Sequence, residues 1–204
     1  MQELTGTTEA WKEFFGLDPL EVCARASIIY NDSLQLYTMS SFGQDVFISL
    51  CRQEVFSDLP AGKSLIGLRE YFFDLSVLWY LIGARNIPLT GNLVKPADVP
   101  GGQIFVKGTH VLPMDAIAQK FNHQKELFLT AGSKYGAVEM DYGDVAVKLL
   151  PFPKVPVYLI LWFGDEDFPP SGQLLLDSTC SSHLSTDVIW AVTMVCCLLI
   201  LRHS

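Results

Sequence analysis

The sequence predicts an α+β fold, in which a single domain combines a mainly antiparallel sheet with packed helices and an apolar C-terminal helix. Helical and strand patterns are interspersed without a regular βαβ period, which is typical of this class. Paired strand patterns recur around short turn sequences, and residues 188–201 are apolar apart from Thr193. Hydrophobic residues make up 50% of the 204 residues, which is enough for a substantial core. We expect residues 1–17 to be an N-terminal extension and residues 18–204 to be the domain itself.

Charge and cysteine content narrow the class of protein further. A formal net charge of −8, with no run of Lys or Arg, argues against nucleic-acid binding, because phosphates require a basic face. The cysteines contain no C-x-x-C pair and are odd in number, so they predict neither an iron–sulfur motif nor a full disulfide framework. The start of the chain lacks the basic residues and apolar core of a secretory signal. We therefore expect a cytoplasmic protein with reduced thiols.

The apolar segment 188–201 bears on membrane attachment. As a helix it would be about 21 Å long, at about 1.5 Å per residue. That length is short of the ~20 residues and ~30 Å that a bilayer core requires. We therefore expect a buried helix, and an anchor to a membrane or a partner is the alternative.

In the first third of the chain, the pattern predicts a helix followed by a hairpin. Asp18 is a suitable N-cap with Pro19 at the first helical position, and we expect this helix to end near Ser27. Segments 34–39 and 45–50 then alternate as two strands around a Ser-Ser-Phe-Gly turn. The side chains of this hairpin that we expect to face the core are Leu34, Leu36, Val46 and Ile48.

The middle of the chain predicts a loop, a long helix and an irregular segment. Residues 57–67 are expected to be a loop, and the Gly-Lys-Ser sequence within it lacks the strand that precedes a phosphate-binding loop. Residues 87–102 are dense in Pro and Gly, which indicates an ordered loop or a segment that faces a cofactor. Residues 68–82 predict the main core helix, ended by Gly83. Its apolar stripe, which packs in the core or flanks a cofactor, consists of Leu68, Phe72, Leu75, Trp79 and Ile82, widened by Tyr71, Leu78 and Leu81.

The last hundred residues predict a short strand, two helices and two hairpins. The short strand is expected at 103–107 and the helices at 113–121 and 124–132. Segments 137–140 and 144–149 form the first hairpin, around an Asp-Tyr-Gly turn.

The second hairpin contains the segment that we expect to be the central strand, residues 155–162, because it is apolar on both faces. Three adjacent carboxylates follow this strand, and Pro169 with Pro170 excludes continued strand or helix. Residues 172–177 have the pattern of a second strand, so the simplest arrangement is a hairpin with a long acidic loop. We name the three carboxylates the acidic trio: Asp165, Glu166 and Asp167.

Several separated motifs point to one family. They are PLTG at 88–91, the segment 93–102 ending in VPGG, residues 118–121, DYGD at 141–144, PKVPV at 153–157, LWFGDEDFP at 161–169 and HLST at 183–186. In order and spacing they resemble the prokaryotic domain of unknown function DUF3786, over roughly residues 18–201.

The DUF3786 resemblance implies a context but no chemistry. This family has no established reaction and no catalytic residues to carry over. Its members are seen mostly in anaerobes, at times beside corrinoid methyl-transfer proteins. Some relatives carry N-terminal cysteines for an iron–sulfur cluster, which this chain lacks.

The acidic trio is the most concentrated set of candidate chemical groups. Its three carboxylates are candidate metal ligands, because hard divalent cations prefer oxygen. Together with His183, Asp165 and Asp167 are also the candidate catalytic acids and bases. A solvated acidic turn is the alternative interpretation.

A second candidate pair is Cys180 with His183. A thiol and an imidazole at this spacing could act together in nucleophilic chemistry or metal ligation. In the alternative interpretation Cys180 lies in a loop beside a helix that Ser185 or Thr186 caps.

Two functions from different classes follow. The first is a non-catalytic binding or accessory module that holds a tetrapyrrole such as haem, or a corrinoid, or that docks onto a redox or methyl-transfer protein. The second is a small metal-assisted hydrolase or lyase that uses the acidic trio. We prefer the first because no nucleophile, base and orienting group occur together. Its candidate cofactor-binding residues are Tyr71, Trp79, Pro100, Gly101, Gly102 and Trp162.

Overall fold

The strands form two antiparallel sheets in the computed structural model, which describes residues 6–67, 73–106 and 108–202. The four-stranded sheet has the order β1-β2-β3-β4, and the five-stranded sheet has the order β5-β9-β8-β7-β6. The predicted α+β fold is confirmed, with the strands divided between two sheets. The strands are β1 Ile29–Asn31, β2 Leu36–Ser41, β3 Gln44–Ser49, β4 Glu54–Phe56, β5 Leu93–Val94, β6 Val138–Met140, β7 Val145–Phe152, β8 Val155–Trp162 and β9 Ser171–Asp177.

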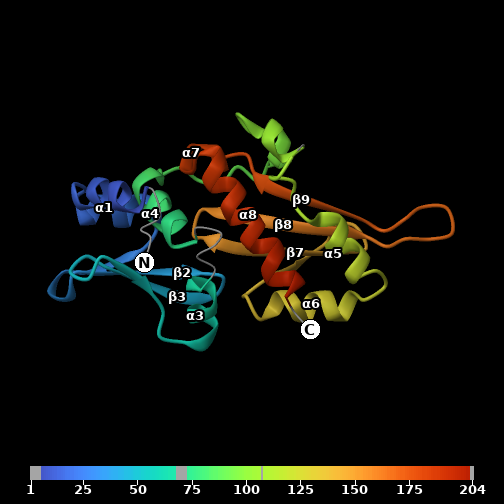
Figure 1. The fold of residues 1–204 in the computed structure, drawn as a ribbon, viewed down its shortest axis with the longest axis horizontal. Coiled ribbons are helices and arrows are strands. Elements are labelled where there is room, and N and C mark those ends of the chain that lie inside the picture. Colours follow the sequence, from blue (N-terminus) through green and yellow to red (C-terminus); the bar gives the residue numbers. More distant parts are fainter. Residues whose placement is uncertain (1–5, 68–72, 107, 203–204) are drawn as a thin grey trace.

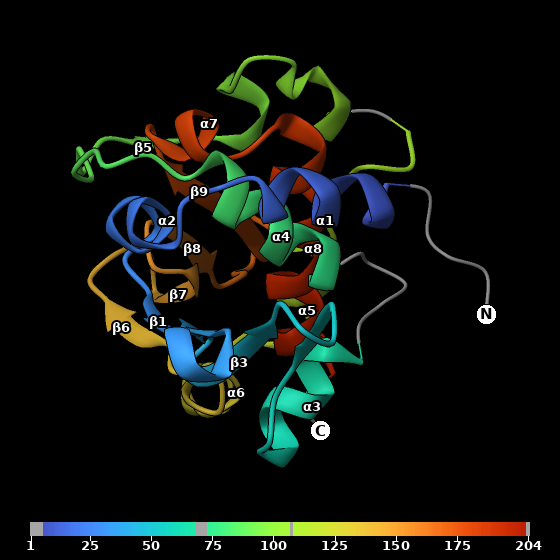
Figure 2. The ribbon, with the colours of Figure 1, turned by 90° about the vertical axis from the view of Figure 1, so that its left-hand side faces the viewer.

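Helices pack against both sheets: α5, α6 and α8 contact the five-stranded sheet, and α2 and α3 contact the four-stranded sheet. α8 lies across one face of this sheet and contacts α4, α5 and α6 (Figure 1). α4 in turn contacts α1, α2 and α8 (Figure 2). The α-helices are α1 Thr7–Phe15, α2 Pro19–Ala26, α3 Pro60–Ile66, α4 Phe73–Gly83, α5 Met114–Lys120, α6 Lys125–Ser133, α7 Cys180–His183 and α8 Thr186–Leu201, and the short 3-10 helices include η1 Asp32–Leu34, η3 Pro96–Asp98 and η4 Gly102–Phe105.

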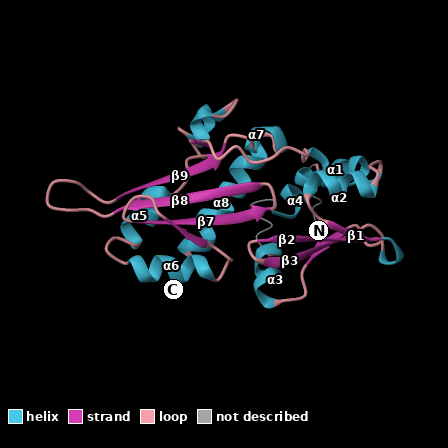
Figure 3. Ribbon diagram, turned by 180° about the vertical axis from the view of Figure 1, so that it is seen from behind, coloured by secondary structure: helices cyan, strands magenta, loops and turns pink. Residues whose placement is uncertain are grey.

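The β8 strand is central, as its two-sided apolar pattern predicted. It pairs with β7 on one side and β9 on the other. The side chains of β8 are buried on both faces of the sheet, except that Tyr158 is half-buried and Trp162 is 38% exposed at the end of the strand. Seen from behind in Figure 3, the β8–β9 loop projects from one end of the sheet, and the four-stranded sheet lies toward the other end. The acidic trio therefore lies on an exposed loop.

The hairpin of β2 and β3 forms where it was predicted, but the prediction of which face of β2 points inward was wrong. Tyr37 pairs with Ile48 and Met39 pairs with Val46, and all four side chains are buried. Leu34 is instead 61% exposed, in η1. Side chains alternate along a strand, so a one-residue change of register reverses which face is inward. The Asp18 cap is confirmed, because its carboxylate accepts a hydrogen bond from the backbone N–H of Glu21 at 2.9 Å.

Two segments have a different structure from the one predicted. Residues 57–67 contain the helix α3, which starts at Pro60 and buries Leu65 and Ile66. The composition of residues 57–67 is typical of a loop and did not indicate this short helix, because the helix is stabilised by burial and not by the helix propensity of its residues. The strand expected at 103–107 is absent from its described residues, where η4 packs against η3 and buries Phe105.

The main helix, α4, buries only part of the predicted stripe. Its described part begins at Phe73, so Leu68, Tyr71 and Phe72 lie outside the described residues. Leu75, Trp79 and Ile82 are only half-buried. Of the predicted stripe, Leu78 and Leu81 are buried. Phe73, Val77 and Tyr80, which were not part of it, are buried as well. A helix that is apolar all round gives no sequence signal for its inward face.

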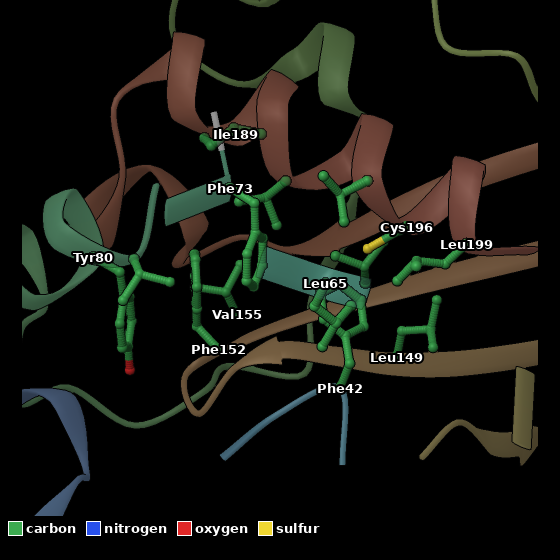
Figure 4. Close-up of a cluster of buried hydrophobic side chains, with 14 of the residues drawn as sticks. Phe42, Leu65, Phe73, Tyr80, Leu149, Phe152, Val155, Ile189, Cys196 and Leu199 are labelled. Atoms are coloured by element: carbon green, nitrogen blue, oxygen red, sulfur yellow. The ribbon is translucent and has the colours of Figure 1, made fainter. Parts of the chain in front are cut away.

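The C-terminal helix is buried, as expected. α8 buries Ile189, Val192, Cys196 and Ile200, among others, against the five-stranded sheet and its neighbouring helices. Figure 4 shows side chains of this helix beside aromatic residues from α4 and β7 in one core cluster. Within the described part of the chain, no helix is long and apolar enough to cross a membrane.

Candidate functional site

The candidate site is a pocket between α4 and the start of α8. Its cavity volume is about 450 Å³, within the ~300–1,000 Å³ range of small-molecule sites. The residues that give it its chemical character are Leu75, Trp79, His110, Ser185, Asp187 and Trp190. Two indole rings, an imidazole and a carboxylate therefore surround one cavity.

The spacing of residues on the two helices explains why these side chains meet. Leu75 and Trp79 are four residues apart on α4, so they share one helix face. Asp187 and Trp190 are three residues apart in the first turns of α8 and share a face in the same way. The opposite side of α8 is held in the core through Ile189. Core packing of both helices thus fixes the walls of the pocket.

Trp190 of α8 is in contact with His110, which lies in the segment between η4 and α5. The ring centroids of His110 and Trp190 are 4.8 Å apart, with the planes at 68°, an edge-to-face arrangement that aromatic pairs prefer. The indole nitrogen of Trp190 is buried and has no hydrogen-bond acceptor among the described residues. Such unpaired buried donors are uncommon in folded proteins.

The Pro100–Gly102 turn is hydrogen-bonded to α8 directly beside this pocket, but the turn does not line the pocket. The hydroxyl of Thr186 donates a hydrogen bond to the carbonyl oxygen of Pro100 at 2.6 Å. Gly101 has a positive φ of 76° and packs against Thr186. Gly102 is buried against the carbonyl oxygens of Pro96 and Ala97. The predicted loop candidates therefore border the site through Thr186.

Trp162 and the acidic trio lie together at the far end of the five-stranded sheet. Trp162 packs over Gly143 at the end of β8. Two adjacent residues, Asn122 and His123, hold the loop that follows β8 at Gly164. His123 donates a hydrogen bond to the carbonyl oxygen of Gly164, and the side chain of Asn122 accepts one from the N–H of Gly164, each at 2.9 Å. An open hollow of about 590 Å³ lies between this pair and the loop.

Within the acidic trio, Asp165 is already engaged by its own loop. One of its carboxylate oxygens accepts the backbone N–H groups of Asp167 and Phe168, at 2.9 and 2.8 Å. These hydrogen bonds, that of Phe168 first, lower the pKa of Asp165. Among the described residues, no group of three or more His, Cys, Asp or Glu is placed to hold a metal ion.

His183 is far from the acidic trio. The β8–β9 pairing runs from Trp162 with Ser171 to Val157 with Leu176, and five steps along it measure about 17 Å. The trio follows the first end of this ladder, and His183 lies in α7, beyond the other end. The structure therefore does not bring the predicted catalytic carboxylates and histidine together.

Cys180 and His183 are the first and last residues of α7, and both are buried. Burial raises the pKa of the Cys180 thiol to about 11, which disfavours the thiolate form. Burial, and then the charge of Lys154, lowers the pKa of His183. Its Nδ1 accepts a hydrogen bond from the backbone N–H of Arg85 at 3.1 Å. This arrangement ties α7 to the end of α4.

Asp177, at the end of β9, is a buried carboxylate that fixes the loop containing PLTG. Its oxygens accept hydrogen bonds from the N–H of Gly91 at 2.8 Å and from both the N–H and hydroxyl of Thr179, at 3.0 and 2.7 Å. It also accepts from Thr90. Burial alone would raise the pKa of Asp177, but these hydrogen bonds outweigh it and the pKa is lowered.

We expect Asp177→Asn to lower the free energy of unfolding by about 2 kcal/mol at neutral pH, because several hydrogen bonds to a charged acceptor are weakened. The folded-state pKa lies below the ordinary value of about 3.9. The contribution is therefore fully present above pH ~4 and is lost as pH falls through the folded-state pKa. Urea unfolding at neutral and acid pH measures this. The exposed Asp98→Asn is the control, and an equal difference between Asp177→Asn and wild type at both pH values would contradict the argument.

Sequence reasoning anticipated part of this pocket. Trp79 was a candidate and lines it, whereas Trp162 lies elsewhere and Tyr71 lies outside the described residues. Trp190 and Asp187 were missed because their segment was interpreted only as a buried helix. His110 was missed because nothing in its local sequence connects it to a helix eighty residues later. Polar and aromatic residues at i and i+3 in an apolar helix were the available signal.

These features define an α+β protein with a pocket walled by aromatic residues. A family model described as a domain of unknown function, DUF3786, matches residues 18–198. The chain therefore belongs to the DUF3786 family, as the motifs predicted. No curated protein and no solved structure matches it.

Proposed function

We propose that this chain is a non-catalytic binding module, and that its ligand is a small organic molecule held in the pocket between α4 and α8. The observation that carries the proposal is the placement of Trp79 and Trp190 on one cavity of about 450 Å³. Indole rings bind apolar and planar groups with large contact area and little loss of side-chain entropy.

Haem and a corrinoid are the cofactors that the family resemblance suggests, and the pocket suits neither of them well. His110 is a possible ligand for iron or cobalt. No Lys or Arg occurs among the described lining residues to pair with the propionates of haem, and Asp187 would repel them. The volume lies at the low end of the usual range, which favours a ligand smaller than a complete tetrapyrrole. We therefore propose a smaller ligand than either cofactor.

The proposed setting is the cytoplasm of an anaerobic prokaryote, where the module would serve a redox or corrinoid methyl-transfer partner. Family resemblance alone motivates this setting. The net charge of −8 is consistent with a protein partner and not with nucleic acid.

The alternative of a metal-assisted hydrolase or lyase receives less support. A strand ladder about 17 Å long lies between His183 and the acidic trio. Asp165 is engaged by its own backbone. His123 lies closer to the trio, but it donates to the Gly164 carbonyl.

Nitrogen-15 NMR of the indole N–H groups tests the proposal, because the chain has four tryptophans and each gives a separate signal. The protein, purified without oxygen, is titrated with benzyl alcohol as a neutral aromatic probe, then with cobalamin and haem. We expect benzyl alcohol, but neither cobalamin nor haem, to cause saturable shifts of the Trp79 and Trp190 signals, with Trp11 and Trp162 unaffected. Trp79→Leu should weaken probe binding about tenfold through the lost aromatic contact. Trp162→Phe is the matched control.

Two results would count against the proposal. In the first, no probe shifts the signal of Trp79 or Trp190. In the second, Trp162→Phe weakens binding as much as Trp79→Leu does, which would place the ligand at the acidic end of the sheet.

A further inference from the structure

The charge at the mouth of the pocket is negative. Asp187 is the carboxylate among its lining residues, and no Lys or Arg is found among the described ones. Asp187 lies in the first turn of α8, whose backbone dipole contributes only about half a positive charge. A full negative charge outweighs this half charge, so the pocket attracts cations.

The aromatic walls of the pocket also favour a cation. Trp79 and Trp190 both line it, and His110 adds a third ring in contact with Trp190. The face of an indole ring is the best aromatic partner for a cation, since its quadrupole is negative there. An aromatic lining with one carboxylate is the environment in which proteins bind alkylated ammonium groups.

The apolar part of the lining favours an alkylated cation over a primary amine. A primary ammonium group carries three N–H donors and needs acceptors for them. Leu75, Val188 and Ala191 supply apolar surface in this pocket, and the acceptors in its lining are the side chains of Ser76, His110, Ser185 and Asp187. A trialkyl or quaternary ammonium group buries its methyl groups against such surface and leaves few or no donors unpaired.

We infer that the pocket binds a small organic cation of the quaternary or trialkyl ammonium class, held by Trp79, Trp190 and Asp187. This inference rests on the proposed function and names the chemical class of its ligand. The carboxylate supplies the selection for positive charge, and the indole rings supply the contact surface.

Choline and its neutral isostere, in which a tert-butyl group replaces the trimethylammonium group, test the charge preference. Their affinities are measured by the same indole signals and by calorimetry. We expect choline to bind about tenfold more tightly than the isostere, within the range known for cation–π contacts. Asp187→Asn should reduce the affinity for choline about fivefold and leave that for the isostere unchanged. Asp115→Asn, which removes an exposed carboxylate from the first turn of α5, is the control.

The outcomes separate this inference from the proposed function. Equal affinity for choline and its isostere, or no binding of choline at millimolar concentration, overturns the inference. An unchanged preference in Asp187→Asn also overturns it, because the selection would then not come from this carboxylate. If benzyl alcohol still shifts Trp79 and Trp190, the proposed function stands without it. If no probe of any charge shifts them, both fail.

Discussion

Replacing Phe152 with alanine is expected to lower the free energy of unfolding by about 4 kcal/mol, in the upper part of the range for large core truncations. Phe152 is fully buried at the end of β7. Its ring stacks on Tyr80 of α4, with centroids 4.6 Å apart and planes at 14°, and lies 6.3 Å from the ring of Phe73. Figure 4 shows these rings together in the core cluster.

The size of this effect follows from the position of Phe152 between two parts of the fold. Nearby, the Ser41 hydroxyl donates to the carbonyl oxygen of Pro151, and the N–H of Phe42 donates to that of Leu150. These contacts join the four-stranded sheet to β7, so the chain around the ring is constrained. The surrounding side chains are therefore poorly able to collapse into the cavity that alanine leaves.

Urea unfolding, followed by circular dichroism, measures this prediction. Phe152→Leu keeps most of the buried volume and should cost about 1–2 kcal/mol. Leu150→Ala, at a 37% exposed position in the same strand, is the matched control. A loss below 1 kcal/mol in Phe152→Ala would show that α4 is not anchored to β7 through this ring.

Gly102→Ala is expected to cost about 3 kcal/mol, because the added methyl group meets rigid backbone. A Cβ at this position would lie within 2.7 Å of the carbonyl oxygens of both Pro96 and Ala97. The φ of Gly102 is not positive, so the requirement for glycine comes from close approach and not from backbone conformation. The turn between η3 and η4 has no flexible side chain that could move aside.

Thermal and urea unfolding of Gly102→Ala measure the cost, with Gly16→Ala as the matched control. At Gly16 the added Cβ would meet its nearest neighbour at an ordinary 3.4 Å, so that variant should be neutral or slightly more stable. Because the turn is fastened to Thr186, the indole signal of Trp190 should also shift in Gly102→Ala. A stable Gly102→Ala protein would mean that the turn, a predicted cofactor-binding segment, is not required to be this compact.

Local patterns were sufficient for the elements whose signals lie in neighbouring residues. The Asp18 cap, the β8 strand and the hairpin around the acidic loop were all predicted, because capping and alternation are short-range properties. The face of β2 and the helix α3 were predicted incorrectly, because both depend on what packs against them.

The candidate site was predictable only in part for the same reason. Trp79 was chosen for its aromatic character, and the structure places it on the pocket. His110, Asp187 and Trp190 come from segments far apart in the chain, and their meeting depends on how α4 and α8 pack. The acidic trio and His183 looked close in sequence, yet an entire strand of antiparallel pairing separates them.

The sequence by itself determined the α+β class, the central position of β8, the burial of α8 and the membership of the DUF3786 family. Each of these follows from apolar periodicity or from motifs that occupy consecutive residues. Only the tertiary structure decided which side of α4 is inward and which aromatic residues surround a cavity. Both helices are apolar all round, so their orientation is set by long-range packing, which no local pattern records.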